Sequence, residues 1–138
     1  MAIMQKESFV LLGTIDAESG SPSTTAVSWL YAVEPARLRF AVDQRSRIIT
    51  NVRHNPLVNI TLFANGTVNA IYGVAEIVKE ALEEVPFKVT CVDITISAVR
   101  DAMFYGSRIS VLPEYEKTYD KRAAEKLDGQ VFDAMRKA

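Results

Sequence analysis

The stretch "RLRFAVDQRSRIITNVRHNP", residues 37–56, changes from a strand pattern to a helix pattern at one charged turn. Its first part is rich in residues typical of strands. Its last part indicates a short helix that ends at Asn55–Pro56, because a proline disfavours helical backbone in the residue before it. Arg45, Ser46 and Arg47 lie between the two parts, and we call these three residues the charged turn.

The charged turn is a candidate site for a small anion. The first turn of a helix carries unpaired N–H groups and the positive end of the peptide dipole, and an arginine beside it adds a planar set of donors. Ser46 is placed as an N-cap, and capping uses the same geometry as a phosphate contact. Two simpler interpretations stay open: Ser46 only caps the helix, and the arginines are only solvated.

Composition limits the possible functions. The chain has 138 residues and is predicted to form a single domain, residues 1–138. Its 16 basic and 17 acidic residues give a formal net charge of −1, so we expect no binding to nucleic acid. No apolar run is long enough for a membrane span, and the N-terminus lacks a secretory-signal pattern. We therefore expect a cytoplasmic protein without a membrane partner.

Cys91 and His54 are the single cysteine and the single histidine of the chain. One cysteine cannot form an intramolecular disulfide or a thiolate cluster, so we interpret Cys91 as a buried structural thiol. His54 falls near the end of the predicted short helix, where a cation interacts favourably with the helix dipole. We expect neither a metal site nor a haem site.

Short strand patterns dominate the chain, and most are separated by turn residues. The connection "EPA", residues 34–36, separates two of them, and Asn65-Gly66 turns one strand into the next. The predicted strands, six in all, are "SFVLLGTID", "TTAVSWLYAV", "RLRFAVD", "PLVNITLFA", "TVNAIYGVAEIVKE" and "KVTCVDITISAVRDAMFYG". Strands at this spacing favour a closed or nearly closed antiparallel barrel.

Helices occupy a smaller part of the chain. The short helix follows the third predicted strand, and "KEALEEVPF" is compatible with another turn or two of helix before Pro86. A C-terminal helix is predicted in the segment that begins at Pro113. Its apolar stripe consists of Tyr119, Ala123, Leu127, Val131 and Met135.

The order of several segments resembles the pyridoxamine 5′-phosphate oxidase-like flavoproteins, the FMN-binding split barrels. The segments are "LLGTID", "TTAVSWLY", "LRFAVDQRSR", "NVRHNPLVNITL" and "IYGVAEIV", and the resemblance runs over residues 8–112. It implies a mainly β fold, a six-stranded antiparallel split barrel with a short helix after the third strand and a C-terminal helix. It also implies a homodimer with FMN held between the subunits.

The resemblance assigns the phosphate side of the FMN site to the charged turn. Members of the family bind the FMN phosphate with a Ser-Arg pair after a strand, which matches Ser46 and Arg47. Asn51 matches a position that is commonly asparagine in the following helix. Arg45 is a candidate for an additional donor, with an arginine exposed to solvent as the alternative.

The resemblance assigns the ring side of the site to Val27, Ser28 and Trp29, which match the strand that flanks the flavin in relatives. Trp29 has an alternative interpretation as an aromatic residue of the core or of a dimer interface. The cofactor-binding set implied by the resemblance is thus Val27, Ser28, Trp29, Arg45, Ser46, Arg47 and Asn51.

Some residues depart from the true oxidases of that family. Ile48 stands where the true oxidases usually have lysine, and Ala41 and Val42 stand where they have hydroxyl-bearing residues. The C-terminal segment with arginine and tryptophan that holds pyridoxal phosphate in those enzymes is also missing, since Trp29 is the single tryptophan. We therefore expect little or no activity on vitamin B6 substrates.

The sequence thus predicts an FMN-binding flavoprotein that acts as an oxidoreductase on an unidentified small molecule, with NADH or NADPH as a possible electron donor. No catalytic side-chain grouping is visible, and none is required where the flavin carries the chemistry. Two alternatives stay open. One is a non-catalytic module that stores flavin or senses redox state, and the other is a small β-barrel whose charged turn binds another phosphate ligand.

Overall fold

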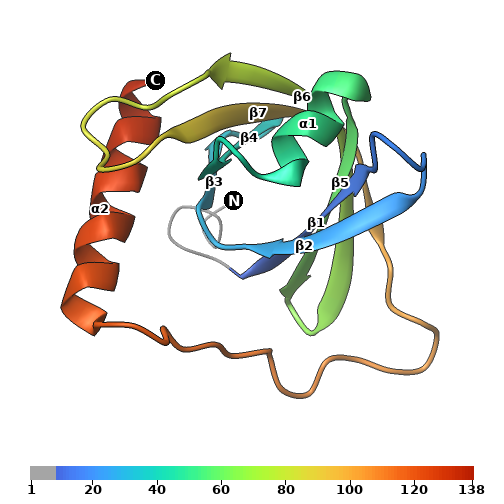
Figure 1. Cartoon of the computed structure of the whole chain (residues 1–138). Helices are drawn as coiled ribbons and strands as arrows, with labels where there is room; N and C mark the ends of the chain where they lie inside the picture. The colour runs from blue at the N-terminus through green and yellow to red at the C-terminus, as the bar shows by residue number, and fades with distance from the viewer. Residues whose placement is uncertain (1–8) are drawn as a thin grey trace.

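A computed structural model of the chain describes residues 9–138 (Figure 1). Residues 1–8, which begin the predicted domain and include Ser8 of the first predicted strand, lie outside the described residues. The elements are β1 (Val10–Ile15), β2 (Pro22–Val27), β3 (Leu30–Glu34), β4 (Arg37–Asp43), α1 (Arg47–His54), β5 (Leu57–Ala64), β6 (Thr67–Lys79), β7 (Val89–Asp101) and α2 (Lys121–Lys137).

The strands of the described chain form one sheet in the order β2-β1-β5-β6-β7-β4-β3. Every neighbouring pair is antiparallel. The sheet curls around α1, and its two edge strands, β2 and β3, follow each other in the chain (Figure 1). This arrangement is an antiparallel split barrel, which confirms the predicted fold class.

The number of strands differs from the prediction. Within residues 9–138 the sheet has seven strands instead of six, because the predicted strand "TTAVSWLYAV" is interrupted at Ser28 and Trp29. β2 pairs with β1, whereas β3 pairs with β4, so the two halves belong to opposite edges of the sheet. The short helix α1 therefore follows the fourth strand, at the place in the sequence where it was predicted.

Local sequence features explain the curvature and the turns. Asn65 and Gly66 both have positive φ, 56° and 74°, as a tight hairpin turn between β5 and β6 requires. β6 carries a register shift between Tyr72 and Gly73 where it pairs with β7. A Cβ atom at Gly73 would lie 2.5 Å from the Thr95 carbonyl oxygen, so the close approach of the two strands requires glycine.

The barrel interior is an apolar core to which α1 contributes Ile48, Ile49 and Val52. These three side chains lie on one face of α1, and they are 3 to 6 % exposed. The core is completed by residues of most of the strands, among them Leu12, Leu38, Phe40, Ile60, Ile71, Val92 and Ile94. α1 is thereby fixed to the barrel, which also fixes the position of the charged turn.

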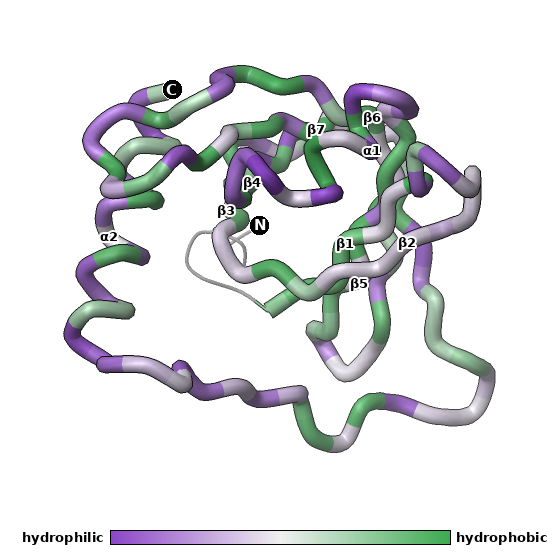
Figure 2. Tube along the Cα trace, in the orientation of Figure 1, coloured by the Kyte–Doolittle hydropathy of each residue, from purple (hydrophilic) through white to green (hydrophobic). Residues whose placement is uncertain are grey.

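A second apolar cluster lies on the outside of the sheet, under α2. Val131 and Met135 of α2 are completely buried there against Ala41 and Cys91. Figure 2 shows hydrophobic and hydrophilic residues alternating along α2, as expected for a helix with one buried face. Cys91 is 0 % exposed and burial raises the pKa of its thiol to about 11, which confirms a buried structural thiol.

Arg39 and Asp93 lie in register on β4 and β7, also beneath α2. The Arg39 guanidinium donates to both carboxylate oxygens of Asp93, at 2.6 and 3.0 Å. Its Nη1 donates to the backbone carbonyl oxygens of Met135 and Ala138, at 2.8 and 3.1 Å. The hydrogen bonds that Arg39 donates to Asp93 raise the pKa of Arg39, which keeps the guanidinium charged. The pair therefore anchors the end of α2 to the barrel.

The larger differences from the predicted elements lie at the end of β7, at the start of α2 and in residues 80–88. β7 ends at Asp101 and α2 begins at Lys121, so the chain between them contains neither helix nor strand. Residues 80–88 form turns and no helix, with Glu84 at a positive φ of 63°. None of the helices in residues 9–138 is long and apolar enough to cross a membrane.

Candidate functional site

The connection between β2 and β3 crosses the split of the barrel. The Leu30 N–H donates to the Ser28 carbonyl at 3.0 Å, and the Ala41 N–H donates to the Trp29 carbonyl at 2.9 Å. Both bonds fix the backbone of the two residues that separate the edge strands. Hydrogen bonds therefore hold the main chain of Ser28 and Trp29 at this crossing.

The charged turn begins directly after β4 and leads into α1. The Ser46 N–H donates to the Asp43 carbonyl at 2.9 Å, which closes the turn. The Ser46 hydroxyl accepts a hydrogen bond from the Ile48 N–H at 3.1 Å. Ser46 is the N-cap of α1, as the sequence predicts, and the positive end of the helix dipole lies beside its hydroxyl.

A pocket of about 330 Å³ lies between these two segments, and we call it the split pocket. Its walls include apolar side chains beside hydroxyl groups. The lining residues are Thr25, Ala26, Val27, Ser28, Trp29, Ala41, Val42, Asp43, Ser46 and Ile48. The fold thus brings four of the predicted cofactor residues together around one cavity: Val27, Ser28, Trp29 and Ser46.

Arg45 and Arg47 do not line the split pocket, and each is paired with a carboxylate. Arg45 is largely exposed and its guanidinium lies 3.0 Å from Asp43. Its side-chain hydrogen bond lowers the pKa of Asp43. Arg47 donates to Asp16 from Nε and Nη2, at 3.2 and 2.8 Å, and Glu18 lies 3.9 Å from the same Nη2. The arginines of the charged turn are therefore next to the pocket and already neutralised.

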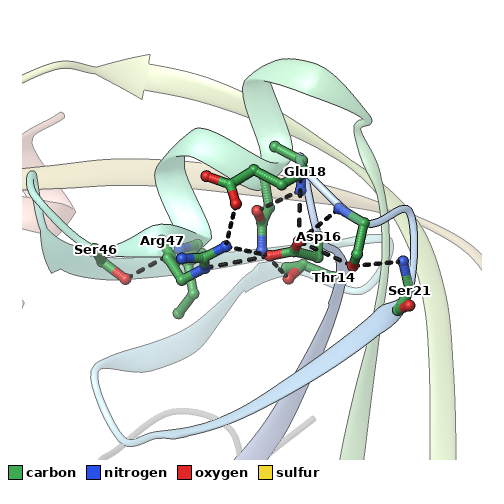
Figure 3. A network of polar contacts seen from close by, with 10 residues as sticks. Thr14, Asp16, Glu18, Ser21, Ser46 and Arg47 are labelled. Carbon is green, nitrogen blue, oxygen red and sulfur yellow. Dashed lines mark hydrogen bonds and ion pairs between the residues drawn. The ribbon is translucent and has the colours of Figure 1, made fainter.

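The contacts of Arg47 belong to a polar network that joins α1 to the turn between β1 and β2 (Figure 3). Asp16 also accepts hydrogen bonds from the Ser19 N–H and hydroxyl, at 2.9 and 3.0 Å. The hydrogen bond from the Ser19 N–H has the largest effect on the pKa of Asp16, and that from the Arg47 side chain the next largest. Together they hold this pKa well below its usual range. Asp16 is thus ionised at neutral pH and holds Arg47 at the start of α1.

Asn51 is buried within the same network and does not line the split pocket. Its amide donates to the Thr14 hydroxyl at 3.0 Å and accepts from the Ala17 N–H at 3.0 Å. These bonds fasten the turn after β1 to α1. A direct contact of Asn51 with a cofactor stays a prediction, and its observed bonds are structural.

Trp29 connects the split pocket to α2. Its indole N–H donates to Asp128 of α2 at 2.8 Å, and its ring lies 6.4 Å from that of Phe87. The ring also packs against the outer apolar cluster. Both interpretations of Trp29 from the sequence therefore agree with its position, since it packs on the outer cluster and lines the pocket.

Sequence reasoning missed Asp16 and Asp128 as parts of the site. Asp16 had a local signal, because an aspartate that starts a turn rich in serine and glycine commonly bonds the backbone N–H groups after it. Asp128 had none. It lies 99 residues from Trp29 along the chain, and nothing in the sequence pattern brings the two together.

Comparison with known proteins agrees with this fold. The model of the family described as pyridoxamine 5′-phosphate oxidase matches residues 1–106, which is most of the chain. The chain belongs to the pyridoxamine 5′-phosphate oxidase family. The match includes the charged turn and all the strands, and it ends before Lys117 and α2. The C-terminal part of this member thus lies outside the family match.

Several solved structures share the fold of this family member at low sequence identity. An F420 reductase is 17 % identical and has a TM-score of 0.60, with 72 % of this chain and 94 % of that chain covered. General Stress Protein 26 from Bacillus anthracis is 17 % identical, with a TM-score of 0.58 and coverage of 72 % and 88 %. HupZ from Group A Streptococcus is 13 % identical, with a TM-score of 0.57 and coverage of 73 % and 89 %. No curated protein matches the sequence.

Proposed function

We propose that this chain is an FMN-binding oxidoreductase that acts on a small molecule in the cytoplasm and holds its flavin in the split pocket. The observation that carries the proposal is the convergence of Val27, Ser28 and Trp29 with Ser46 around one cavity at the start of α1. The first three were assigned to the flavin ring and the last to its phosphate. Membership of the family supports flavin as the cofactor class.

The pocket residues fit the two parts of FMN. Val27, Val42 and Ile48 offer apolar contact to a planar ring. The Ser46 hydroxyl and the start of α1 suit a phosphate group. When bound, a flavin supplies hydride or single-electron transfer at its ring. The side chains of this chain then bind the flavin, orient it and limit its contact with water.

Arg47 is placed to add charge-assisted hydrogen bonds to the phosphate. A guanidinium has five N–H donors, and the bonds of Arg47 to Asp16 use only Nε and Nη2. The Nη1 donors therefore remain for an anion, while Asp16 holds the rest of the group in place. Because Arg47 is largely exposed, it can also exchange carboxylate for phosphate at little cost.

We further propose that the functional unit is a homodimer, in which a second copy covers the split pocket. The split pocket is open to solvent and not enclosed, so a ligand held there is covered more completely when a second copy packs over it. A closed site excludes water from the reacting ring. Light scattering tests this directly: we expect a dimer at micromolar concentration, and a flavin-loaded monomer would contradict the proposal.

A non-catalytic flavin module is the second candidate function, and the chemistry of the pocket lining is compatible with it. Asp43 is the single carboxylic acid in the pocket lining, and its hydrogen bonds to Arg45 lower its pKa. No neighbouring group of the lining can exchange a proton with a substrate near neutral pH. Such a lining suits either hydride transfer, which needs no acid or base from the protein, or storage of the cofactor.

The absorption spectrum of the purified protein and the mass of the compound released on denaturation test the proposal. We expect a yellow protein that releases FMN. If the protein releases a deazaflavin instead, its cofactor is not FMN and belongs to the class that the name of the F420 reductase indicates. A colourless protein that binds inorganic phosphate and no flavin would contradict the proposal and favour the phosphate-binding barrel.

Anaerobic mixing with NADH or NADPH separates the two flavin functions. Bleaching of the flavin absorbance within seconds supports an oxidoreductase, and no bleaching with either donor favours the module. Pyridoxamine 5′-phosphate serves as a comparison substrate. We expect poor turnover or none, because Ile48 and the absence of a second tryptophan remove contacts that the true oxidases use.

A further inference from the structure

We propose that Asp128 of α2 is a positioning residue for the split pocket: it sets the orientation of the Trp29 indole that forms one wall. α2 thereby controls how tightly the pocket holds its ligand. The inference rests on the proposed function, because the ligand in question is the flavin. It adds a part of the chain that lies outside the family match.

The main chain of Trp29 is fixed, and its side chain has one group that can form a hydrogen bond. Hydrogen bonds at Leu30 and Ala41 hold its main chain in place, so only the side chain has freedom to turn. An indole has a single N–H donor. That donor is bonded to the Asp128 carboxylate at 2.8 Å. One acceptor on α2 therefore decides which way the ring faces.

Asp128 is itself held firmly. The second oxygen of its carboxylate lies 3.2 Å from the Lys117 ammonium, and the Asp128 side chain is only 18 % exposed. A hydrogen bond to an ionised, partly buried acceptor is stronger than one between neutral groups. The Phe87 ring lies beside the indole, with the two ring centroids 6.4 Å apart.

The Trp29 ring is shared between two parts of the molecule, and this links α2 to the split pocket. Trp29 lines the split pocket and also packs against the outer apolar cluster that α2 covers. A change in its tilt alters the shape of the pocket wall without any change in the charged turn. Affinity for a planar ligand therefore depends on a residue of α2 that does not itself line the pocket.

Two substitutions and a control test this role. Asp128→Leu keeps the size of the side chain and removes the acceptor, whereas Asp128→Asn keeps an acceptor oxygen. Asp133→Leu makes the same change at an exposed position of the same helix and is the matched control. Because Trp29 is the single tryptophan, the intrinsic fluorescence of the flavin-free protein reports on this one ring.

We expect Asp128→Leu to shift the tryptophan emission, to raise its quenching by iodide and to weaken FMN binding roughly three- to tenfold. Asp128→Asn and Asp133→Leu should stay close to the wild type. The proposal is overturned if Asp128→Leu leaves the emission and quenching unchanged, or if it leaves the FMN affinity of a flavin-binding wild type unchanged.

A double-substitution cycle separates positioning from general damage. Trp29→Phe keeps an aromatic ring and removes the donor, so Asp128→Leu should have no further effect on FMN affinity in that background. An equal loss in both backgrounds would mean that Asp128 acts only on stability, and would overturn the proposal. Should Asp128→Leu fail to fold, Asp128→Ala takes its place in the cycle. A wild type that binds no FMN contradicts the proposed function, while the emission measurements still decide the role of Asp128.

Discussion

Two arginine–carboxylate pairs of this chain have similar chemistry and different surroundings. Arg39 and Asp93 lie under α2, with side chains that are 8 and 9 % exposed. Arg47 and Asp16 lie at the start of α1, where the Arg47 side chain is 66 % exposed and the Asp16 side chain 15 % exposed. In both pairs the guanidinium donates from Nε and Nη2. Burial therefore distinguishes a pair that fixes the fold from a pair that can exchange its partner.

The physical reason is the cost of desolvation. Removing one member of a buried pair leaves a charge without water and without a partner, which is strongly unfavourable. A pair with an exposed arginine loses less when it opens, because water and ions reach the guanidinium. We therefore expect Arg39 to contribute to stability and Arg47 to ligand binding.

Arg39→Met should have the largest effect on folding. It removes the closer of two cations from buried Asp93, leaving Arg37 Nε at 3.7 Å, and removes the donors to the carbonyls of Met135 and Ala138. We expect a loss of about 3–5 kcal/mol in the free energy of unfolding, measured by urea titration. Arg47→Met, the same substitution at the exposed pair, is the control and should barely change the midpoint. Equal effects of the two substitutions would remove the distinction between the pairs.

Replacing both members of the buried pair should be far milder than replacing one. In Arg39→Met combined with Asp93→Leu no buried charge is left unpaired, and well-packed apolar residues often replace a buried ion pair without loss. We expect the double variant to recover most of the stability that Arg39→Met loses. A double variant as unstable as the single one would show that Arg39 acts mainly through the carbonyls of α2.

Ser46→Ala should have a smaller effect, of about 1 kcal/mol, on the stability of the flavin-free protein. The substitution removes the acceptor for the Ile48 N–H and leaves both arginine pairs in place. Thermal melting of the flavin-free protein measures this loss. An unchanged melting temperature would mean that the hydroxyl does not stabilise α1, so that any loss of FMN affinity would come from the phosphate alone.

The smallest expected effect is a pH dependence at Asp16. The Ser19 N–H and Arg47 hold the pKa of Asp16 below its ordinary value of 3.8. The stabilisation from its charge is therefore complete above that value and is lost as the pH falls below it. The difference in unfolding free energy between wild type and Asp16→Asn should be largest at pH 7 and should narrow below about pH 4. Glu18→Gln is the control, and an Asp16→Asn difference that stays constant down to pH 3 would contradict the network.

The comparison also explains what the sequence predicts well. Local patterns were sufficient for the location of most strands, for the Asn65-Gly66 turn and for the cap at Ser46, because each depends on neighbours in the chain. The break at Ser28 was missed because the residues on both sides favour strands, and only pairing with different partners separates them. The break exists because β2 pairs with β1 and β3 pairs with β4, at opposite edges of the sheet.

The partners of the charged groups were the least predictable part of the site. Asp93 occupies a polar position of an alternating strand, which normally faces solvent, and it is buried only because α2 covers that face. Asp16 reaches Arg47 across 31 residues of chain through the turn after β1. Such contacts depend on how distant elements meet, and periodicity carries no information about them.

Titration of the wild type and of Arg47→Ala with FMN and with riboflavin tests the central claim most directly. If Arg47 bonds the phosphate, its loss should weaken FMN binding roughly ten- to a hundredfold and leave the weaker binding of riboflavin unchanged. Arg53→Ala, at the other end of α1, is the matched control and should leave both affinities as they are. Equal FMN affinity in the wild type and in Arg47→Ala would contradict the account, and a loss shared by riboflavin would show that the substitution damages the pocket itself.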